Sequence, residues 1–139
     1  MIIRNYKNKD KEQVKSLIKG VLKEIFGTAE NLEDLDNINK NFQLFLVAED
    51  NGEIIGTLGI KNEGDARISR MYVKKENRGG GIGKALMKEA LKYCKGKFKR
   101  IFLSTYPQMN SQGFYKKGGF RVYKKDERIW MEKINSLRQ

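Results

Sequence analysis

Histidine is absent from this sequence of 139 residues. Without an imidazole, the chain can form neither a Ser-His-Asp triad nor a Cys-His pair, and it has no histidine to act as a general base or to bind a metal. Proton transfer must therefore use tyrosine, aspartate, glutamate, lysine, a chain terminus or water. We expect no metal in the functional site.

Cysteine is almost absent as well, since Cys94 stands alone. One cysteine allows neither an internal disulfide nor a zinc site built from several thiolates, and this composition fits a reducing compartment. Cys94 falls on the apolar stripe of a predicted helix. We therefore interpret it as a small core residue and not as a nucleophile.

Long apolar runs are also missing. No stretch is long enough to cross a bilayer, and the first ten residues, MIIRNYKNKD, lack the apolar core and cleavage site of a signal peptide. We expect a cytoplasmic protein without a membrane partner.

Positive charge is plentiful: 29 lysines and arginines stand against 17 acidic residues, for a formal net charge of +12. Residues 74–100 alone carry ten basic and two acidic side chains. Such a balance favours a polyanion, either nucleic acid or a small molecule with several phosphates. A lysine-rich solvated surface is the simpler explanation for many of these charges.

The length is that of one ordinary domain with a buried core, so we predict a single domain over residues 1–139. Hydrophobic periodicity predicts an α/β domain with helices packed on one mixed sheet. Strands are predicted at 2–6, 65–73 and 100–105, hairpins at 43–60 and 120–134, and helices or helical turns at 10–27, 28–42, 84–96 and 109–117.

Local sequence signals allow detailed predictions for the first helix and for the strand at 65–73. Asp10 with Gln13 predicts a capping box at the start of the helix, and Gly27 predicts its end. Regular alternation along the strand predicts that one face carries Ala66, Ile68, Arg70 and Tyr72.

The segment between residues 30 and 36 is acidic in an otherwise basic chain. It could attract a cationic substrate, although such a run is more often the solvent-exposed face of a helix. Its thin apolar stripe predicts only a marginal second helix.

Glycine is concentrated at residues 79–83, between a predicted strand and a predicted helix. A P-loop, G-x-x-x-x-G-K-[ST], would need glycine in place of Arg78 and a hydroxyl residue in place of Ala85. The dinucleotide-binding pattern G-x-G-x-x-G would need glycine in place of Lys84 or Leu86. Both patterns are excluded.

The remaining pattern is R-x-x-G-x-G, formed by Arg78, Gly81 and Gly83. A helix N-terminus offers free N–H groups and partial positive charge, and residues without side chains let a diphosphate lie directly on them. A loop that only turns the strand into the helix would account for one or two of the glycines. Further positive charge is available from Lys74, Lys75, Lys84 and Lys88.

Two segments carry a resemblance to a known family. The stretch MYVKKENRGGGIGKALMKEAL, residues 71–91, resembles the pyrophosphate loop (Q/R)-x-x-G-x-(G/A) of the GNAT superfamily of N-acetyltransferases, which follows a central strand. The stretch FYKKGGF, residues 114–120, is similar to that family's later F/L-Y-x-x-x-G-F segment. The order of predicted elements agrees with the family over residues 1 to about 134.

This resemblance implies a mixed, mostly antiparallel sheet of about seven strands with flanking helices, in which the strands at 65–74 and 99–105 run parallel and splay apart. It implies acetyl-CoA, or a longer acyl-CoA, as donor. In the family the strand before the loop pairs with the pantetheine arm and the loop holds the pyrophosphate. The residues expected to bind coenzyme A are Met71, Tyr72, Val73, Arg78, Gly79, Gly80, Gly81, Ile82, Gly83, Lys84, Asn110 and Ser111.

Direct acyl transfer needs an uncharged amine, a polarised thioester carbonyl and a proton for the departing thiolate. The resemblance implies that Tyr115 supplies the proton or orients the sulfur, and that the backbone N–H of Val73 polarises the carbonyl. Many relatives carry a glutamate within the strand at 65–73, and this chain does not. Glu63 and Asp65, a water relay or an amine of low pKa remain candidates for the base.

The alternative is a non-catalytic module on the same fold that senses acyl-CoA or binds nucleic acid. Binding to bases requires aromatic side chains exposed on a sheet face, and Ile101 and Leu103 indicate a buried strand, so nucleic acid is not expected. The acceptor is a small-molecule or peptide amine. Trp130 and Tyr123 could border its pocket or simply pack, and a homodimer would agree with many relatives.

Overall fold

The computed structural model describes residues 1–135, and in them seven strands form one open sheet in the order β1-β2-β3-β4-β5-β7-β6. The strands are β1 (Ile2–Asn5), β2 (Leu44–Asp50), β3 (Glu53–Glu63), β4 (Asp65–Val73), β5 (Arg100–Thr105), β6 (Arg121–Lys125) and β7 (Ile129–Ile134). The helices are α1 (Lys11–Phe26), α2 (Ile38–Asn41), α3 (Ile82–Cys94) and α4 (Gln112–Lys117). Neighbouring strands are antiparallel except β4 and β5, which are parallel. The α/β class and mixed sheet are confirmed.

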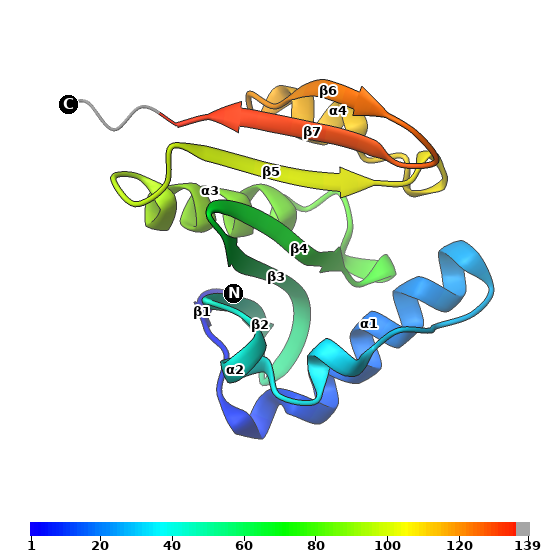
Figure 1. Ribbon diagram of the computed structural model, residues 1–139. Helices are drawn as coiled ribbons and strands as arrows, with labels where there is room; N and C mark the ends of the chain where they lie inside the picture. Colours follow the sequence, from blue (N-terminus) through cyan, green and yellow to red (C-terminus); the bar gives the residue numbers. More distant parts are fainter. Residues whose placement is uncertain (136–139) are drawn as a thin grey trace.

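Two hydrophobic clusters lie on opposite faces of the sheet, and β2 shows why. Its residues alternate: Leu46 and Ala48 belong to the cluster beneath α3, while Phe45 and Val47 belong to the cluster beneath α1 and α2. In Figure 1, α3 and α4 lie behind the strands, and α1 and α2 lie at the end of the sheet that contains β1–β3. No helix of residues 1–135 is both long and apolar enough to cross a membrane.

Helix α1 begins after Asp10 and ends at Gly27, as predicted, but the contacts that cap its beginning differ. Gly27 adopts a left-handed conformation, φ 80°, and its N–H donates to the carbonyl of Lys23. The capping box of Asp10 with Gln13 was wrong. Asp10 instead accepts from Arg4 and from the N–H of Lys7, because a 3₁₀ turn precedes the helix.

Gln13 instead contacts residues that are distant in the sequence. Its side chain accepts from the N–H of Ile54 at 2.9 Å and donates to the carbonyl of Gly52 at 3.3 Å. It therefore fixes α1 to the β2–β3 hairpin, whose turn residues Asn51 and Gly52 both have positive φ, as a two-residue hairpin turn requires.

The acidic segment folds as a 3₁₀ turn at Glu33–Leu35 followed by the short α2. Two of its carboxylates are committed to ion pairs: Asp34 with Arg70 at 2.8 Å, and Asp36 with Lys15 at 3.3 Å. These two are therefore not free to attract a cationic ligand.

Strand β4 contains a bulge that reverses its alternation. Arg70 has φ 55°, and the register against β3 shifts between Thr57 and Gly59. Ala66 and Ile68 face the α3 cluster, but so does Met71 after the bulge, while Tyr72 packs against the α1 cluster. The predicted face shared by Ala66, Ile68, Arg70 and Tyr72 was therefore wrong beyond Ile68.

Strands β4 and β5 are paired at two positions, Ala66 with Ile101 and Arg67 with Phe102. Beyond these positions no pairing between described residues connects the two strands, so they separate toward their carboxyl ends. The splay implied by the resemblance is confirmed, and it opens the sheet beside the glycine loop (Figure 1).

Candidate functional site

A cavity of about 930 Å³ lies where β4 and β5 separate. Its walls come from the end of β4, the glycine loop, the first turns of α3, the segment from Met109 through α4 to Phe120, and Val21 and Ile25 of α1. Elements distant in sequence therefore converge here because the β4–β5 ladder stops short.

The glycine loop has the conformation that its composition predicts. Gly79 and Gly81 have φ of 84° and 85°, a left-handed region that other residues rarely adopt, and an added Cβ would meet no atom within 4 Å at either. Gly81 precedes α3 directly, so the free N–H groups of the first turn open at the loop. A compact anion fits against this backbone.

Arg78 is held at the edge of the loop by α1. Its guanidinium donates to both carboxylate oxygens of Glu24, at 2.7 and 2.9 Å, and its Nε donates to the carbonyl of Val73 at 2.9 Å. The hydrogen bonds from Arg78 lower the pKa of the Glu24 carboxyl below its usual range. The pair is partly exposed, so a phosphate can reach the guanidinium from solvent.

The end of β4 presents backbone groups to the gap. The N–H of Lys74 donates to the carbonyl of Ile55 on β3. Since successive residues of a strand direct their backbone groups to opposite neighbours, the N–H and carbonyl of Val73 face the side that β5 has left. The bond from Arg78 to the Val73 carbonyl agrees with this direction.

Tyr115 lines the cavity from α4. Its side chain is 8% exposed, and its ring makes edge contacts with Phe114 and Phe120 at centroid distances of 5.4 and 6.0 Å. Its Oη donates to Met71 Sδ at 3.8 Å, which brings it beside β4. Burial raises the pKa of the phenol far above its usual value, and the nearby Tyr72 adds to the shift.

Asn110 and Ser111 lie between β5 and α4. Asn110 has φ 53° and ends a 3₁₀ turn, and Ser111 precedes α4. The Ser111 hydroxyl lies 2.9 Å from the Thr105 hydroxyl at the end of β5. Both residues line the cavity, with the Ser111 side chain already partnered.

The structure brings almost all the predicted site residues together. Gly80 is the exception, since it does not line the cavity. The residues that do are Met71, Tyr72, Val73, Arg78, Gly79, Gly81, Ile82, Gly83, Lys84, Asn110, Ser111 and Tyr115.

The charged side chains in the described lining of the cavity are all positive. Its described lining includes Arg78, Lys84, Lys88 and Lys117 and no carboxylate. Of the candidate bases, Glu63 pairs with Arg67 and Asp65 with Arg100, and neither lines the cavity. The cavity therefore suits an anionic ligand and offers no carboxylate to accept a proton.

Sequence reasoning missed several residues of the site. Glu24 and Ile25 belong to a helix that the sequence connected only with the core, and Arg78 and Glu24 are 54 positions apart. Lys117 and Phe114 stood in the quoted FYKKGGF segment and could have been found, because Tyr115 of the same segment was assigned to the site.

Cys94 is a core residue, as predicted. It is 1% exposed, and burial raises the pKa of its thiol to about 11, so it remains protonated and unreactive.

Comparison with known proteins identifies the family. The matching family model, described as the Acetyltransferase (GNAT) family, spans residues 11–120. A Bacillus subtilis (strain 168) protein, provisionally named as a ribosomal protein bS18-alanine N-acetyltransferase, is 35% identical over 83 residues, covering 55% of this chain and 53% of that protein. The chain thus matches about half the length of this curated relative.

Solved structures agree over nearly the whole chain. A GNAT-family acetyltransferase from Staphylococcus aureus MU50 has a TM-score of 0.87 at 26% identity, covering 99% of both chains. The PaiA N-acetyltransferase from Thermoplasma acidophilum, in complex with coenzyme A, has a TM-score of 0.80 at 24% identity, covering 96% of this chain and 98% of that one. The resemblance found in the sequence is confirmed, and this chain belongs to the GNAT family of acetyltransferases.

Proposed function

We propose that this protein is an N-acetyltransferase that moves the acetyl group of acetyl-CoA to a primary amine by direct attack. One observation supports this best: the glycine loop, the unpaired backbone of β4 and the Tyr115 hydroxyl meet in one cavity of about 930 Å³. Family membership supports the same class of reaction, and the comparisons give no support to a non-catalytic or nucleic-acid-binding module.

The chain's own groups match the parts of coenzyme A. The loop from Arg78 to Gly83, with Lys84, would hold the pyrophosphate through backbone N–H groups and positive charge. The backbone of Met71–Val73 would pair with the amides of the pantetheine arm, in the place that β5 leaves open. Asn110 and Ser111 would contact the arm from the opposite wall.

Two groups would act on the thioester. The N–H of Val73, which faces the gap, would donate to the carbonyl oxygen as negative charge develops there. A tyrosine phenol is protonated at neutral pH, and burial raises the pKa of Tyr115 further, so its hydroxyl can donate a hydrogen bond to the thiolate that leaves.

The amine must lose a proton before or during attack. No carboxylate lines the described cavity, so we propose that water accepts this proton, or that the acceptor binds as the free amine. The reaction would then accelerate as the pH rises toward the pKa of the acceptor amine.

We also propose one catalytic domain over residues 1–139, a cytoplasmic location and assembly into a homodimer. The acceptor class we propose is a small-molecule or peptide amine. A single cysteine supports a reducing compartment. Sedimentation of the purified protein would measure the oligomeric state.

Thermal unfolding with and without acetyl-CoA, with two glycine variants, tests the donor assignment. Gly81→Glu fills the loop, and Gly96→Glu is its matched control, since both glycines have positive φ with no atom within 4 Å of an added Cβ and lie at opposite ends of α3. Each of the two substitutions should therefore introduce a similar backbone strain.

Acetyl-CoA at about 100 times its Kd should stabilise the wild type and Gly96→Glu by about 2.7 kcal/mol, and Gly81→Glu much less. Release of the CoA thiol in the presence of amines would then measure turnover. Equal stabilisation of both variants, or none in the wild type, would reject the loop as the acetyl-CoA site.

A further inference from the structure

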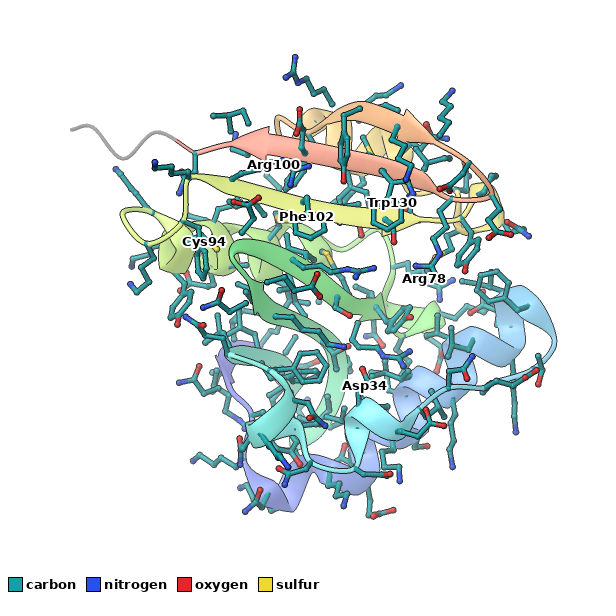
Figure 2. The ribbon with its side chains drawn as sticks, viewed as in Figure 1. Asp34, Arg78, Cys94, Arg100, Phe102 and Trp130 are labelled. Atoms are coloured by element: carbon teal, nitrogen blue, oxygen red, sulfur yellow. The ribbon has the colours of Figure 1, made fainter. Side chains whose placement is uncertain are left out.

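Aromatic rings and cations alternate across the face of β5 and β7 that α3 and α4 do not cover. Figure 2 shows Arg100, Phe102 and Trp130 on this face, and in Figure 1 no helix of the described residues lies over it. The members that matter here, which we call the stacked row, are Tyr106, Arg128, Trp130, Arg67, Phe102 and Arg100.

Most cations of the stacked row have carboxylate partners. Arg67 pairs with Glu63 at 3.5 Å, and Arg100 pairs with Asp65 at 3.1 Å and with Glu132 at 2.7 Å. Their charge is therefore neutralised locally, and these contacts account for their positions on the sheet.

Arg128 differs from the others. Its Cζ lies 5.2 Å from the centre of the Tyr106 ring and 5.9 Å from that of Trp130, and its one side-chain hydrogen bond among residues 1–135 is a long one, 3.4 Å, to the Ser104 hydroxyl. Within residues 1–135 no carboxylate lies within 4 Å of its guanidinium. Two rings thus hold a guanidinium in place while its donors stay available.

Arg128 lies at the mouth of the gap between β4 and β5. Ser104 is near the end of β5, beyond the last position at which β5 pairs with β4. The ring of Tyr106 contacts the ring of Phe26 at 5.5 Å, and Phe26 follows Ile25, which lines the cavity. Arg128 does not itself line the cavity, and it is connected with the cavity through Tyr106, Phe26 and the adjacent Ile25.

We propose that Arg128 binds a carboxylate carried by the acceptor, so that the acceptor is an amine that also bears an acidic group. This inference rests on the proposed acetyltransferase function and narrows its substrate class. The planar fork of a guanidinium matches a carboxylate through two parallel hydrogen bonds. Contact with two rings limits the motion of the side chain, so less freedom is lost on binding.

Two of the four carboxylates of the acidic segment are already in ion pairs. Asp34 and Asp36 are already paired with Arg70 and with Lys15.

Acceptor pairs that differ by one carboxylate provide the test. Initial rates of CoA release would be compared for Ala-Glu amide against Ala-Gln amide, and for 4-aminobutyrate against 4-aminobutyramide. The variants are Arg128→Gln, the charge-preserving Arg128→Lys, and Lys125→Gln as a control on an exposed cation of the same hairpin. Thermal unfolding with acetyl-CoA would verify that each variant folds and binds the donor.

The wild type and Lys125→Gln should prefer the acid of each pair by about tenfold in kcat/KM. Arg128→Gln should lose this preference through a higher KM for the acid, with its rates for the amides unchanged, and Arg128→Lys should retain part of it. Acetylation without preference for the acids, or a preference that survives in Arg128→Gln, would overturn the assignment. Failure to acetylate any amine while acetyl-CoA binds would instead refute the proposed function, and this inference with it.

Discussion

The hydroxyl of Tyr115 has one polar contact in the described structure, Met71 Sδ, while its ring is enclosed by Phe114 and Phe120. A group whose ring packs and whose hydroxyl faces a cavity can be tested by removing one oxygen atom. Because the one polar contact of the hydroxyl is a 3.8 Å bond to a thioether, which is a weak acceptor, its loss should affect the chemical step more than the fold.

We predict that Tyr115→Phe lowers kcat by about a hundredfold or more, with KM for acetyl-CoA changed little. Tyr93→Phe is the matched control, since its hydroxyl accepts from Gln43 on the surface and does not line the cavity. Steady-state kinetics would compare the two variants. Unchanged turnover in Tyr115→Phe would limit that residue to orienting the donor.

At this scale the sequence predicted the loop and Tyr115 because their signals are local. Glycines adjacent to a helix start, and a tyrosine before Gly118 and Gly119, are visible in short stretches. The roles of Glu24 and Arg128 depend on contacts between distant segments, so neither could be found without the fold.

Among the helices and strands, β4 contains an unfavourable backbone conformation that other contacts must stabilise. Arg70 has positive φ without being glycine, and the hydroxyl of buried Thr57 donates to its carbonyl at 2.8 Å. Its guanidinium donates to Asp34 at 3.0 and 2.8 Å, and both side chains are largely buried. The ion pair therefore connects the bulge to the segment before α2.

We predict that Asp34→Asn lowers the free energy of unfolding by about 2–3 kcal/mol, because it leaves the buried Arg70 cation unpaired. Asp36→Asn should change it by less than about 0.5 kcal/mol, since the Asp36 side chain is 65% exposed in its pair with Lys15. Urea unfolding would measure both. Equal effects would mean that the Arg70 pair does not stabilise the bulge.

The ends of helices and strands were predictable where the backbone conformation favours particular residue types. Gly27 and the Asn51-Gly52 turn adopt the positive φ that their residue types favour. The bulge was not predictable, because neither Arg70 nor its neighbours are residues that usually mark one. The short α2 was only marginal in sequence, since Ile38 is its one buried residue and Leu35 belongs to the 3₁₀ turn before it.

Across the whole molecule, several carboxylates stabilise the fold only while they are ionised. The pKa of Asp10 is lowered by hydrogen bonds from Arg4, and that of Glu132 by hydrogen bonds from Arg100. For Asp34, burial acts to raise the pKa, but the hydrogen bonds and charge of Arg70 prevail and lower it. All three titrate at lower pH in the folded state than in the unfolded chain.

We predict that stability is nearly constant from pH 7 to about 5 and falls as the pH drops below about 4. The sign follows from the lowered pKa values: the unfolded chain binds these protons first, so acidification favours unfolding. Urea unfolding from pH 3 to 7 would measure the slope, which should be smaller in Asp10→Asn because one carboxylate no longer titrates. Rising stability on acidification would contradict the assignment.

The short ladder between β4 and β5 also has a consequence for folding kinetics. On either side of it the sheet consists of antiparallel strands, while β4 and β5 meet across the long connection that contains α3. Contacts between distant segments form late, since the intervening chain must first be ordered. We therefore expect the antiparallel units β2–β3–β4 and β6–β7, whose strands are joined by short turns, to assemble before the β4–β5 ladder closes, so that the cavity appears only after these units have formed.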